Sequence, residues 1–181
     1  MMASIASDHQ PRSGPAERRP GGAELAAAYR EHYRSLVRLA SLLIDDVGTC
    51  EEVVQDAFVQ VWRTAPQLRS PDRLPAYLRS AVLNGARSTL RKRVVRRRHL
   101  TSAPDPAPAA ETDAMAGDPD HSVLRALRAL PVRQREVLAL RYYLDLSETD
   151  IAETLGISTG SVKTHAHRGL TALAAALEDL R

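Results

Sequence analysis

The side chains best suited to chemistry lie near the C-terminus, on one face of a helix expected over residues 159–177. Lysine and arginine on this face can donate hydrogen bonds to guanine edges or to phosphates, and threonine can pair with several bases. The amino terminus of the same helix offers free backbone amides and the positive end of its dipole to an anion. The face therefore predicts contact with the major groove of DNA. Its polar residues are Ser161, Lys163, Thr164, His167 and Arg168.

A helix-turn-helix must position that face, and the sequence carries the expected caps and turn. Ser147 is expected to cap a first helix, with Asp150 reaching back to it as in a capping box. Gly156 is expected to supply the left-handed residue that ends this helix, and the side chain of Ile157 is expected to pack into the core. Ser158 is expected to cap the next helix. A helical hairpin used only for packing does not require this spacing, so we expect DNA binding. The inner face of the second helix is expected to carry Val162, Ala166, Leu170 and Leu173.

Other reactive residue types form no catalytic or metal-binding pattern. His165 and His167 are two positions apart on a helix and point to different faces, so no metal site is predicted. No nucleophile, base and acid occur together in a way that indicates catalysis, and no cofactor is predicted. The single cysteine, Cys50, cannot form an internal disulfide and is expected to open a helix where any small residue would serve. Without a signal peptide or a run of about 20 apolar residues, the chain is expected to be cytoplasmic.

Charge is distributed unevenly along the chain, although the formal net charge is only +3. Residues 73–104 contain no acid and include a run of arginines, whereas residues 39–62 contain acids and no base. Unrelieved like charge favours a partner of opposite sign. We therefore expect a polyanion at the basic stretch and a basic protein surface at the acidic one, unless both are simply solvated helix faces.

Hydrophobic periodicity predicts an all-α protein made of two small helical domains. No strand-like alternation of apolar and polar residues occurs. In the first half, helical spacing covers 24–44, 51–63 and 75–98, with a turn at 45–49 and a proline-containing loop at 66–74. In the second half, it covers 122–130, 132–143, 147–155 and 159–177.

Composition divides the chain into four parts. Residues 1–22 are interpreted as a disordered tail, 23–99 as the first domain, 100–121 as a linker and 122–181 as the second domain. The linker is expected to be flexible, acidic and rich in proline and alanine. Extended at ~3.1 Å per residue it would span roughly 60 Å, enough for the two domains to occupy DNA sites about 17 base pairs apart.

Several stretches resemble the extracytoplasmic-function sigma factors of the sigma-70 family. Residues 51–63, and residues 76–84 with the arginine run after them, resemble region two of that family. Residues 130–143 and 151–163 resemble region four. The short length and the Arg-Tyr-Tyr-Leu-Asp-Leu-Ser run are similar to a compact actinobacterial, SigE-like group. The resemblance implies a sigma factor that binds core RNA polymerase and promoter DNA, with an anti-sigma factor as an optional further partner.

The resemblance also implies roles by position. The acidic helix is the family's docking face for the largest polymerase subunit, which implies polymerase contacts at Glu52, Gln55 and Asp56. The loop at 66–74 corresponds to the element that captures a flipped base of the upstream-ten motif. Contacts with that motif as a single strand are implied for Arg69, Tyr77, Arg79, Asn84, Arg87 and Arg91. The recognition face of residues 161–168 is implied to read the upstream-thirty-five element in the major groove.

The sequence departs from the family pattern at a few of these positions. Tyr77 stands where the family usually has tryptophan, although tyrosine can still stack on a base. Ser80 and Ala81 occupy the positions where housekeeping members carry a paired aromatic wedge. The small residues imply weaker promoter melting and a narrow promoter range.

Two other interpretations remain open from the sequence. Residues 161–165 also resemble the recognition helix of response-regulator-type transcriptional regulators, but residues 24–99 lack the alternating strands and helices of a receiver domain. An interaction module that binds polymerase through the acidic helix alone would not need the basic run, which is present. DNA binding by the free protein would favour the response-regulator type, because sigma factors generally need core polymerase.

Overall fold

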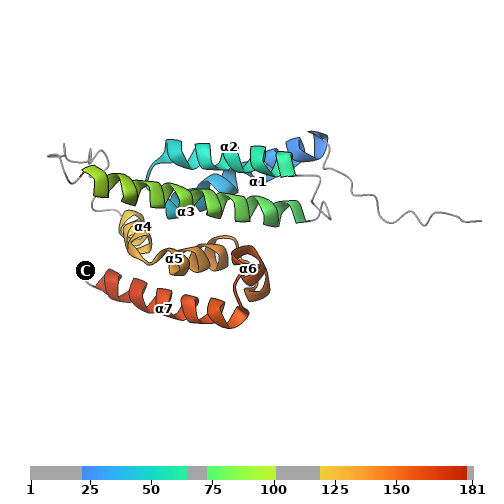
Figure 1. Cartoon of the computed structure of the whole chain (residues 1–181). Helices are drawn as coiled ribbons and strands as arrows, with labels where there is room; N and C mark the ends of the chain where they lie inside the picture. The colour runs from blue at the N-terminus through green and yellow to red at the C-terminus, as the bar shows by residue number, and fades with distance from the viewer. Residues whose placement is uncertain (1–21, 65–72, 101–118, 179–181) are drawn as a thin grey trace, which may run out of the picture.

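The computed structural model describes residues 22–64, 73–100 and 119–178, and every regular element within these ranges is a helix. Figure 1 shows two layers, with α1 to α3 in one and α4 to α7 in the other. The all-α prediction is therefore confirmed, while nearly all of the expected tail and nearly all of the linker lie outside the described residues. The elements are α1 (Gly22–Leu43), α2 (Val47–Thr64), α3 (Leu74–Leu100), α4 (Pro119–Ala129), α5 (Val132–Leu138), the π-helical segment η4 (Ala139–Tyr143), α6 (Glu148–Leu155) and α7 (Thr159–Glu178).

Helices α1, α2 and α3 pack around one apolar core, because each carries an apolar stripe on its inner face. Gly85 lets α3 approach α2 closely, since a Cβ at this position would lie 2.8 Å from Cγ1 of Val53. Most of the predicted α2 stripe is buried, but Trp62 is 48% exposed. Successive helical residues differ by about 100° in direction, so Trp62 falls outside the line that Phe58 and Val61 follow into the core. Among the described helices, none has the length and apolar character needed to cross a membrane.

The start of α2 corrects the predicted turn at 45–49. The helix begins at Val47 rather than at Glu51, so Gly48 is a helical residue. The cause is Asp46, whose Oδ1 accepts a hydrogen bond from the backbone N–H of Thr49 at 2.6 Å. The carbonyl of Asp46 then accepts the hydrogen bond of Cys50 at 3.0 Å. A carboxylate cap thus starts the helix four residues early.

Cys50 consequently lies inside α2 and does not open it as expected. Its side chain has no exposed surface, and burial raises the pKa of the thiol to about 11 from 9.0. The thiol of Cys50 therefore stays protonated to higher pH in the folded state than in the unfolded chain. The stability that this buried thiol contributes is complete below about pH 9 and is lost as pH rises toward 11.

We expect native Cys50 to react with iodoacetamide at pH 8 about 100-fold more slowly than the urea-unfolded chain does. The reason is that two pKa units reduce the thiolate fraction about 100-fold, before burial of the sulfur is considered. Mass spectrometry of samples quenched at intervals would measure both rates. Equal labelling of native and unfolded protein would contradict the packing of α2 against α1 and α3.

Helices α4 to α7 form the second unit, and its caps match the prediction. Ser147 Oγ accepts a hydrogen bond from the backbone N–H of Asp150 at 3.1 Å and donates to its carboxylate at 2.6 Å. Gly156 ends α6 in the left-handed conformation, with φ of 64°. Ser158 Oγ accepts from the backbone N–H of Ser161 at 3.1 Å and so caps α7. The predicted helix-turn-helix is confirmed.

The helix predicted over 132–143 changes its winding partway along. It is α-helical as far as Leu138 and π-helical over Ala139–Tyr143, where the N–H of Leu144 donates to the carbonyl of Ala139 at 3.3 Å. The wider turn carries Tyr143 to α1, and its hydroxyl donates to the carbonyl of Ser35 at 3.4 Å. The π-helical segment thereby joins the second unit to the first.

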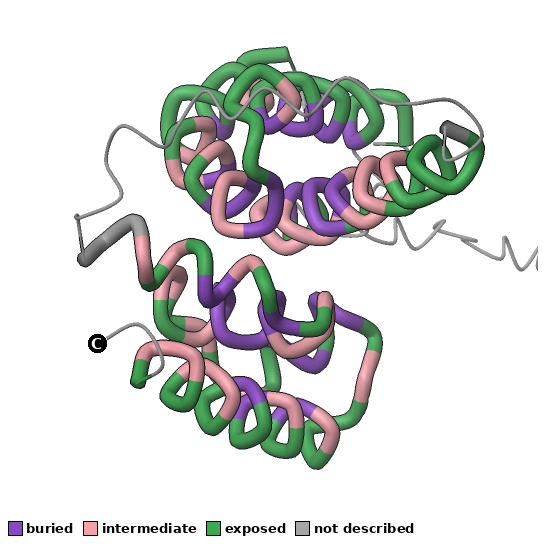
Figure 2. The backbone as a smooth tube through the Cα atoms, turned by 90° about the vertical axis from the view of Figure 1, so that its left-hand side faces the viewer, coloured by how far each residue is buried: buried purple, intermediate pink, exposed green. Residues whose placement is uncertain are grey.

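The two units pack directly against each other, and we call this packing the closed arrangement. Helix α1 contacts α4, α5 and η4, and α3 contacts α6. Figure 2 shows that buried segments occur within each unit and along the sides where the two units meet. At the end of α1, Arg128 donates to the carbonyl of Ser41 at 2.6 Å and Arg135 donates to that of Leu43 at 2.7 Å. Cations from the second unit thus satisfy the carbonyls at the negative end of a helix in the first.

Candidate nucleic-acid interface

The face of α7 that was predicted to read DNA is open to solvent. Lys163, Thr164, His167 and Arg168 are exposed, whereas Ser161 is half-buried and its hydroxyl lies 2.9 Å from that of Ser158. Figure 1 shows α7 on the side of the second unit that faces away from α1–α3. The closed arrangement therefore leaves this recognition face accessible.

The polar side chains of this face are held by weak contacts within the second unit. The hydroxyl of Thr164 donates to the carbonyl of Gly160 at 3.0 Å. Nζ of Lys163 lies 3.6 Å from Oε2 of Glu148, and Oε1 of the same carboxylate accepts a hydrogen bond from Arg141 at 3.1 Å. Lys163 is 68% exposed, and exposed pairs of this kind contribute about 0–1 kcal/mol. Lys163 can therefore exchange Glu148 for a base edge or a phosphate at little cost.

The inner face of α7 differs from the prediction at one position. Val162 and Ala166 are buried as expected and Leu173 is half-buried, but Leu170 is 42% exposed. Gly169 takes its place on the contact line, where an added Cβ would lie 3.1 Å from Cδ1 of Leu138. Because a residue without a side chain lets α7 approach α5 here, the contact line passes through Gly169 and Leu170 turns outward.

The acidic face of α2 is also open. Glu52, Gln55 and Asp56 are exposed, while Val54 and Phe58 point from the same helix into the core. In Figure 1, α2 lies at the outer side of the first unit, away from α4–α7. A basic protein surface can therefore dock on this face without disturbing the closed arrangement.

The residues of α3 predicted to contact single-stranded DNA lie in a different setting. Tyr77 is 38% exposed, and Asn84 and Arg91 are exposed, but Arg79 and Arg87 are half-buried beside the second unit. The remaining one, Arg69, lies outside the described residues, as does most of the loop predicted at 66–74. The residues of α3 predicted to contact DNA therefore divide into an exposed group and a group that packs beside the second unit.

Arg87 forms a bidentate ion pair with Glu136 of α5. Nε of Arg87 lies 2.5 Å from Oε1 of Glu136, and Nη2 lies 3.0 Å from Oε2. The side chain of Glu136 is only 1% exposed, and Arg133 adds a further contact at 3.2 Å. The third nitrogen of Arg87, Nη1, donates to Oδ1 of Asn84 at 2.8 Å. One predicted promoter residue, Arg87, thus forms the contact between the units, and a second, Asn84, accepts a hydrogen bond from it within α3.

Carboxylates of α6 lie beside the basic amino-terminal half of α3. Nη1 of Arg73 is 3.3 Å from Oε1 of Glu153. Burial lowers the pKa of Arg79, an effect that the negative charges of Asp150 and Glu153 oppose. The hydroxyl of Ser80 donates to the carbonyl of a further α6 residue at 3.1 Å. Acidic groups of the second unit therefore occupy the side of α3 where DNA phosphates were expected.

Glu136 is the residue of this interface that the sequence analysis missed. Its local signal is an acid followed directly by the apolar run Val137–Leu140, which is buried. An acid next to such a run indicates a buried carboxylate that needs a cationic partner. The partner, Arg87, lies 49 residues earlier in the chain, so the local pattern does not identify it.

Comparison with known proteins follows the same division of the chain. Residues 28–96 match the Sigma-70 region 2 model and residues 120–173 match the Sigma-70, region 4 model. The ECF RNA polymerase sigma factor SigM of Mycobacterium tuberculosis is 31% identical over 147 residues, which cover 81% of this chain and 73% of SigM. The candidate RNA polymerase sigma factor RfaY of Xanthomonas campestris is 29% identical over 143 residues, which are 74% of this chain and 35% of RfaY.

A solved structure supports the fold. The sigma factor RpoE of Bartonella quintana, determined in complex with the anti-sigma factor NepR, matches with a TM-score of 0.70 and 22% identity over 87% of this chain and 99% of RpoE. The response-regulator interpretation is not favoured, because residues 28–96 match a sigma region and not a receiver domain. Since both sigma regions follow each other in order and SigM matches over most of its length, the chain is an RNA polymerase sigma factor of the extracytoplasmic-function group of the sigma-70 family.

Proposed function

We propose that this sigma factor docks on core RNA polymerase through the acidic face of α2 and guides it to promoters through α7 and α3. The observation that carries the proposal is the exposed recognition face of α7, mounted on a helix-turn-helix whose caps are all formed. The protein then acts by binding, without catalysis of its own, in the cytoplasm. Its parts would be a tail (1–22), region two (23–99), a linker (100–121) and region four (122–181).

Each side chain of the recognition face has a proposed role in reading the upstream-thirty-five element. Lys163 and Thr164 lie near the start of α7 and would contact base edges, while Ser161 and His167 flank them. Arg168 lies further along the helix and would contact a phosphate. These assignments separate sequence preference from overall affinity, because base contacts specify a site and phosphate contacts hold any site.

Substitution of the recognition face is expected to separate these two roles. Lys163→Ala or Thr164→Ala should relax preference at one or two upstream promoter positions, with a loss of about 1–3 kcal/mol for the preferred base. Arg168→Ala should weaken binding to all sequences and reduce the salt slope by about one unit. Transcription from a promoter library with core polymerase, repeated at several salt concentrations, measures both effects.

Thr171→Ala is the matched control for Thr164→Ala. Both hydroxyls donate to the carbonyl four residues earlier at 3.0 Å and both are exposed, so each variant loses the same hydrogen bond within α7. Only Thr164 lies near the amino terminus of the helix, so only Thr164→Ala should change promoter preference. If all of the recognition-face variants kept the preferred sequence and promoter strength, α7 would not be a DNA reader.

The proposed contacts of α3 with the upstream-ten element require the units to separate. In the closed arrangement Arg87 is committed to Glu136, and Arg79 lies among carboxylates of α6. Binding to core polymerase would draw the two regions apart and release these cations, so that they could bind single-stranded DNA alongside the already exposed Tyr77 and Asn84. An anti-sigma factor is a further proposed partner, supported by the match to RpoE in complex with NepR.

A further inference from the structure

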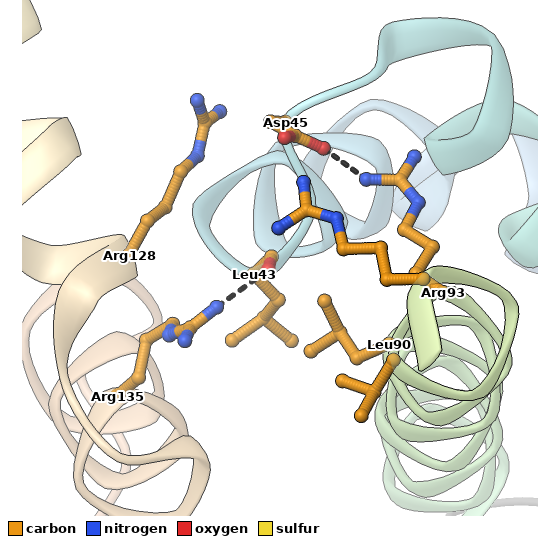
Figure 3. A pocket seen from close by; sticks show the side chains of 8 residues that line it. Leu43, Asp45, Leu90, Arg93, Arg128 and Arg135 are labelled. Atoms are coloured by element: carbon orange, nitrogen blue, oxygen red, sulfur yellow. Dashed lines mark hydrogen bonds and ion pairs between the residues drawn. The ribbon is translucent and has the colours of Figure 1, made fainter. Parts of the chain in front are cut away.

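A cluster of arginines surrounds a small pocket between the two units. Figure 3 shows Arg93 and Leu90 reaching in from α3, and Arg128 and Arg135 from the second unit, around the chain that follows α1. The pocket has a volume of about 220 Å³. Its lining residues are Leu43, Asp45, Leu90, Arg93, Val94, Arg97, Arg128 and Arg135.

Positive charge in this pocket exceeds negative charge. Four guanidinium groups and one carboxylate, Asp45, line it, so the formal charge of the lining side chains is +3. The carboxyl-terminal end of α1 supplies the equivalent of about −0.5. Arg93 pairs with Asp45, while Arg128 and Arg135 donate to carbonyls of α1. Those carbonyls satisfy hydrogen bonds without removing a unit of charge, so positive charge stays in excess among the residues that line the pocket.

The electrostatics of the individual groups agree with this excess. Burial lowers the pKa of Arg135, and the neighbouring charge of Arg128 lowers it further, although Glu136 and Asp45 act in the opposite direction. Arg135 is 7% exposed, and its buried Nε has no hydrogen-bond partner among the described residues. Burial by itself raises the pKa of Asp45, but Arg93 and then Arg128 hold it below its ordinary value. Arg93 and Arg128 therefore favour the negative charge of Asp45 within the pocket.

We propose that this arginine pocket binds the phosphate groups of a small oligophosphate anion, such as the pyrophosphate part of a nucleotide. Guanidinium groups present paired N–H donors that match two phosphate oxygens, and phosphate concentrates negative charge in a small volume. Ligand pockets for whole drug-sized molecules occupy about 300–1,000 Å³. The volume of about 220 Å³ therefore fits the phosphate groups, with any nucleoside lying outside.

Such a ligand would hold the closed arrangement together. Arg93 and Arg97 come from α3 of the first unit, whereas Arg128 and Arg135 come from α4 and α5 of the second. An anion that contacts both pairs binds the closed arrangement better than the separated units and stabilises it by mass action. This regulatory consequence rests on the proposed function, because opening matters only if α3 must reach promoter DNA. The binding site itself does not depend on that function.

Isothermal titration of the full chain with sodium pyrophosphate tests the site, at constant ionic strength set with sodium chloride. We expect one saturable site per chain and a rise in melting temperature on binding. Arg97→Gln and Arg128→Gln should each weaken binding about tenfold, the effect of losing one charge-assisted hydrogen bond. Arg96→Gln is the matched control, because Arg96 is an exposed α3 residue that does not line the pocket, and it should bind as the parent chain does.

Duplex DNA of random sequence forms the second arm of the experiment, because its backbone carries the same phosphate chemistry. If pyrophosphate binds and DNA does not displace it, the phosphate groups that occupy the pocket belong to a small anion. A different result is that DNA displaces pyrophosphate, and that Arg97→Gln and Arg128→Gln bind DNA more weakly while Arg96→Gln does not. The phosphate groups that occupy the pocket then belong to nucleic acid. The proposal is overturned if pyrophosphate fails to bind, or binds equally to all variants. Transcription with core polymerase, measured separately, reports on the sigma function alone.

Discussion

Replacing Glu136 with glutamine is expected to open the closed arrangement. The substitution keeps the shape of the side chain but removes the charge that holds Arg87 at 2.5 Å and 3.0 Å. Breaking a buried ion pair by removing one charge costs about 3–5 kcal/mol. Arg87 retains 20% side-chain exposure, so we expect about 3 kcal/mol, which shifts the balance toward the separated units about 100-fold. Small-angle scattering should show a larger radius of gyration.

The same variant should expose the α3 face to DNA. We expect Glu136→Gln to bind a single-stranded upstream-ten oligonucleotide without core polymerase, measured by fluorescence anisotropy, and the parent chain to bind it weakly. Glu153→Gln is the matched control, because Glu153 also pairs with an arginine, Arg73 just before α3, but both partners are more than half exposed. Exposed pairs contribute about 0–1 kcal/mol, so this variant should change little. An unchanged radius and unchanged oligonucleotide affinity in Glu136→Gln would refute the closed arrangement as a barrier.

Reversing the charge of Asp56 should remove binding to core polymerase while leaving the fold intact. Asp56 is exposed on the acidic face of α2, outside the apolar stripe that builds the core. Asp56→Arg places a cation where a basic protein surface is proposed to dock, and like charges across an interface cost several kcal/mol. We expect the affinity for purified core polymerase to fall by about 2–5 kcal/mol, measured by fluorescence-detected binding.

Glu31→Arg makes the same charge change at another exposed site of the first unit. The Glu31 side chain is 73% exposed on α1, so this variant controls for the general effect of added positive charge. Both variants should keep the helical circular dichroism and melting temperature of the parent chain. If Asp56→Arg bound core polymerase as tightly as the parent chain, the docking assignment would be wrong. If both variants lost the same affinity, the loss would reflect added positive charge in general and not a contact at Asp56.

Local features of the second unit were predictable because each depends on a few neighbouring residues. Ser147, Gly156 and Ser158 form the caps and the left-handed turn expected from their types, since caps need only a side-chain oxygen or a free φ. The exposure of Gln55 and Asp56 followed from the apolar stripe of their helix. The cap that Asp46 forms is equally local, but the neighbouring Gly48 favoured a turn at this point in the sequence.

Features that depend on distant residues were not predictable. The outward turn of Leu170 depends on how closely Gly169 approaches Leu138, which belongs to another helix. The π-helical winding of Ala139–Tyr143 leaves no separate mark in a pattern of apolar residues. The ion pair of Arg87 with Glu136 joins two segments on either side of the linker. The basic run of α3 indicated a polyanion as its partner, and in the closed arrangement the partner of Arg87 is a carboxylate of the same chain.

The dual engagement of Arg87 has a consequence for how this sequence can diverge. A substitution at Arg87 changes the contact with Glu136 and, under the proposed function, a contact with promoter DNA as well. Arg87→Lys keeps the charge but loses the planar two-point match to the carboxylate, so both contacts weaken together. Selection on promoter preference and selection on the closed arrangement therefore act on one codon. Viable changes at Arg87 should appear in related genomes paired with changes at Glu136, and a deep mutational scan of the two positions would reveal that coupling.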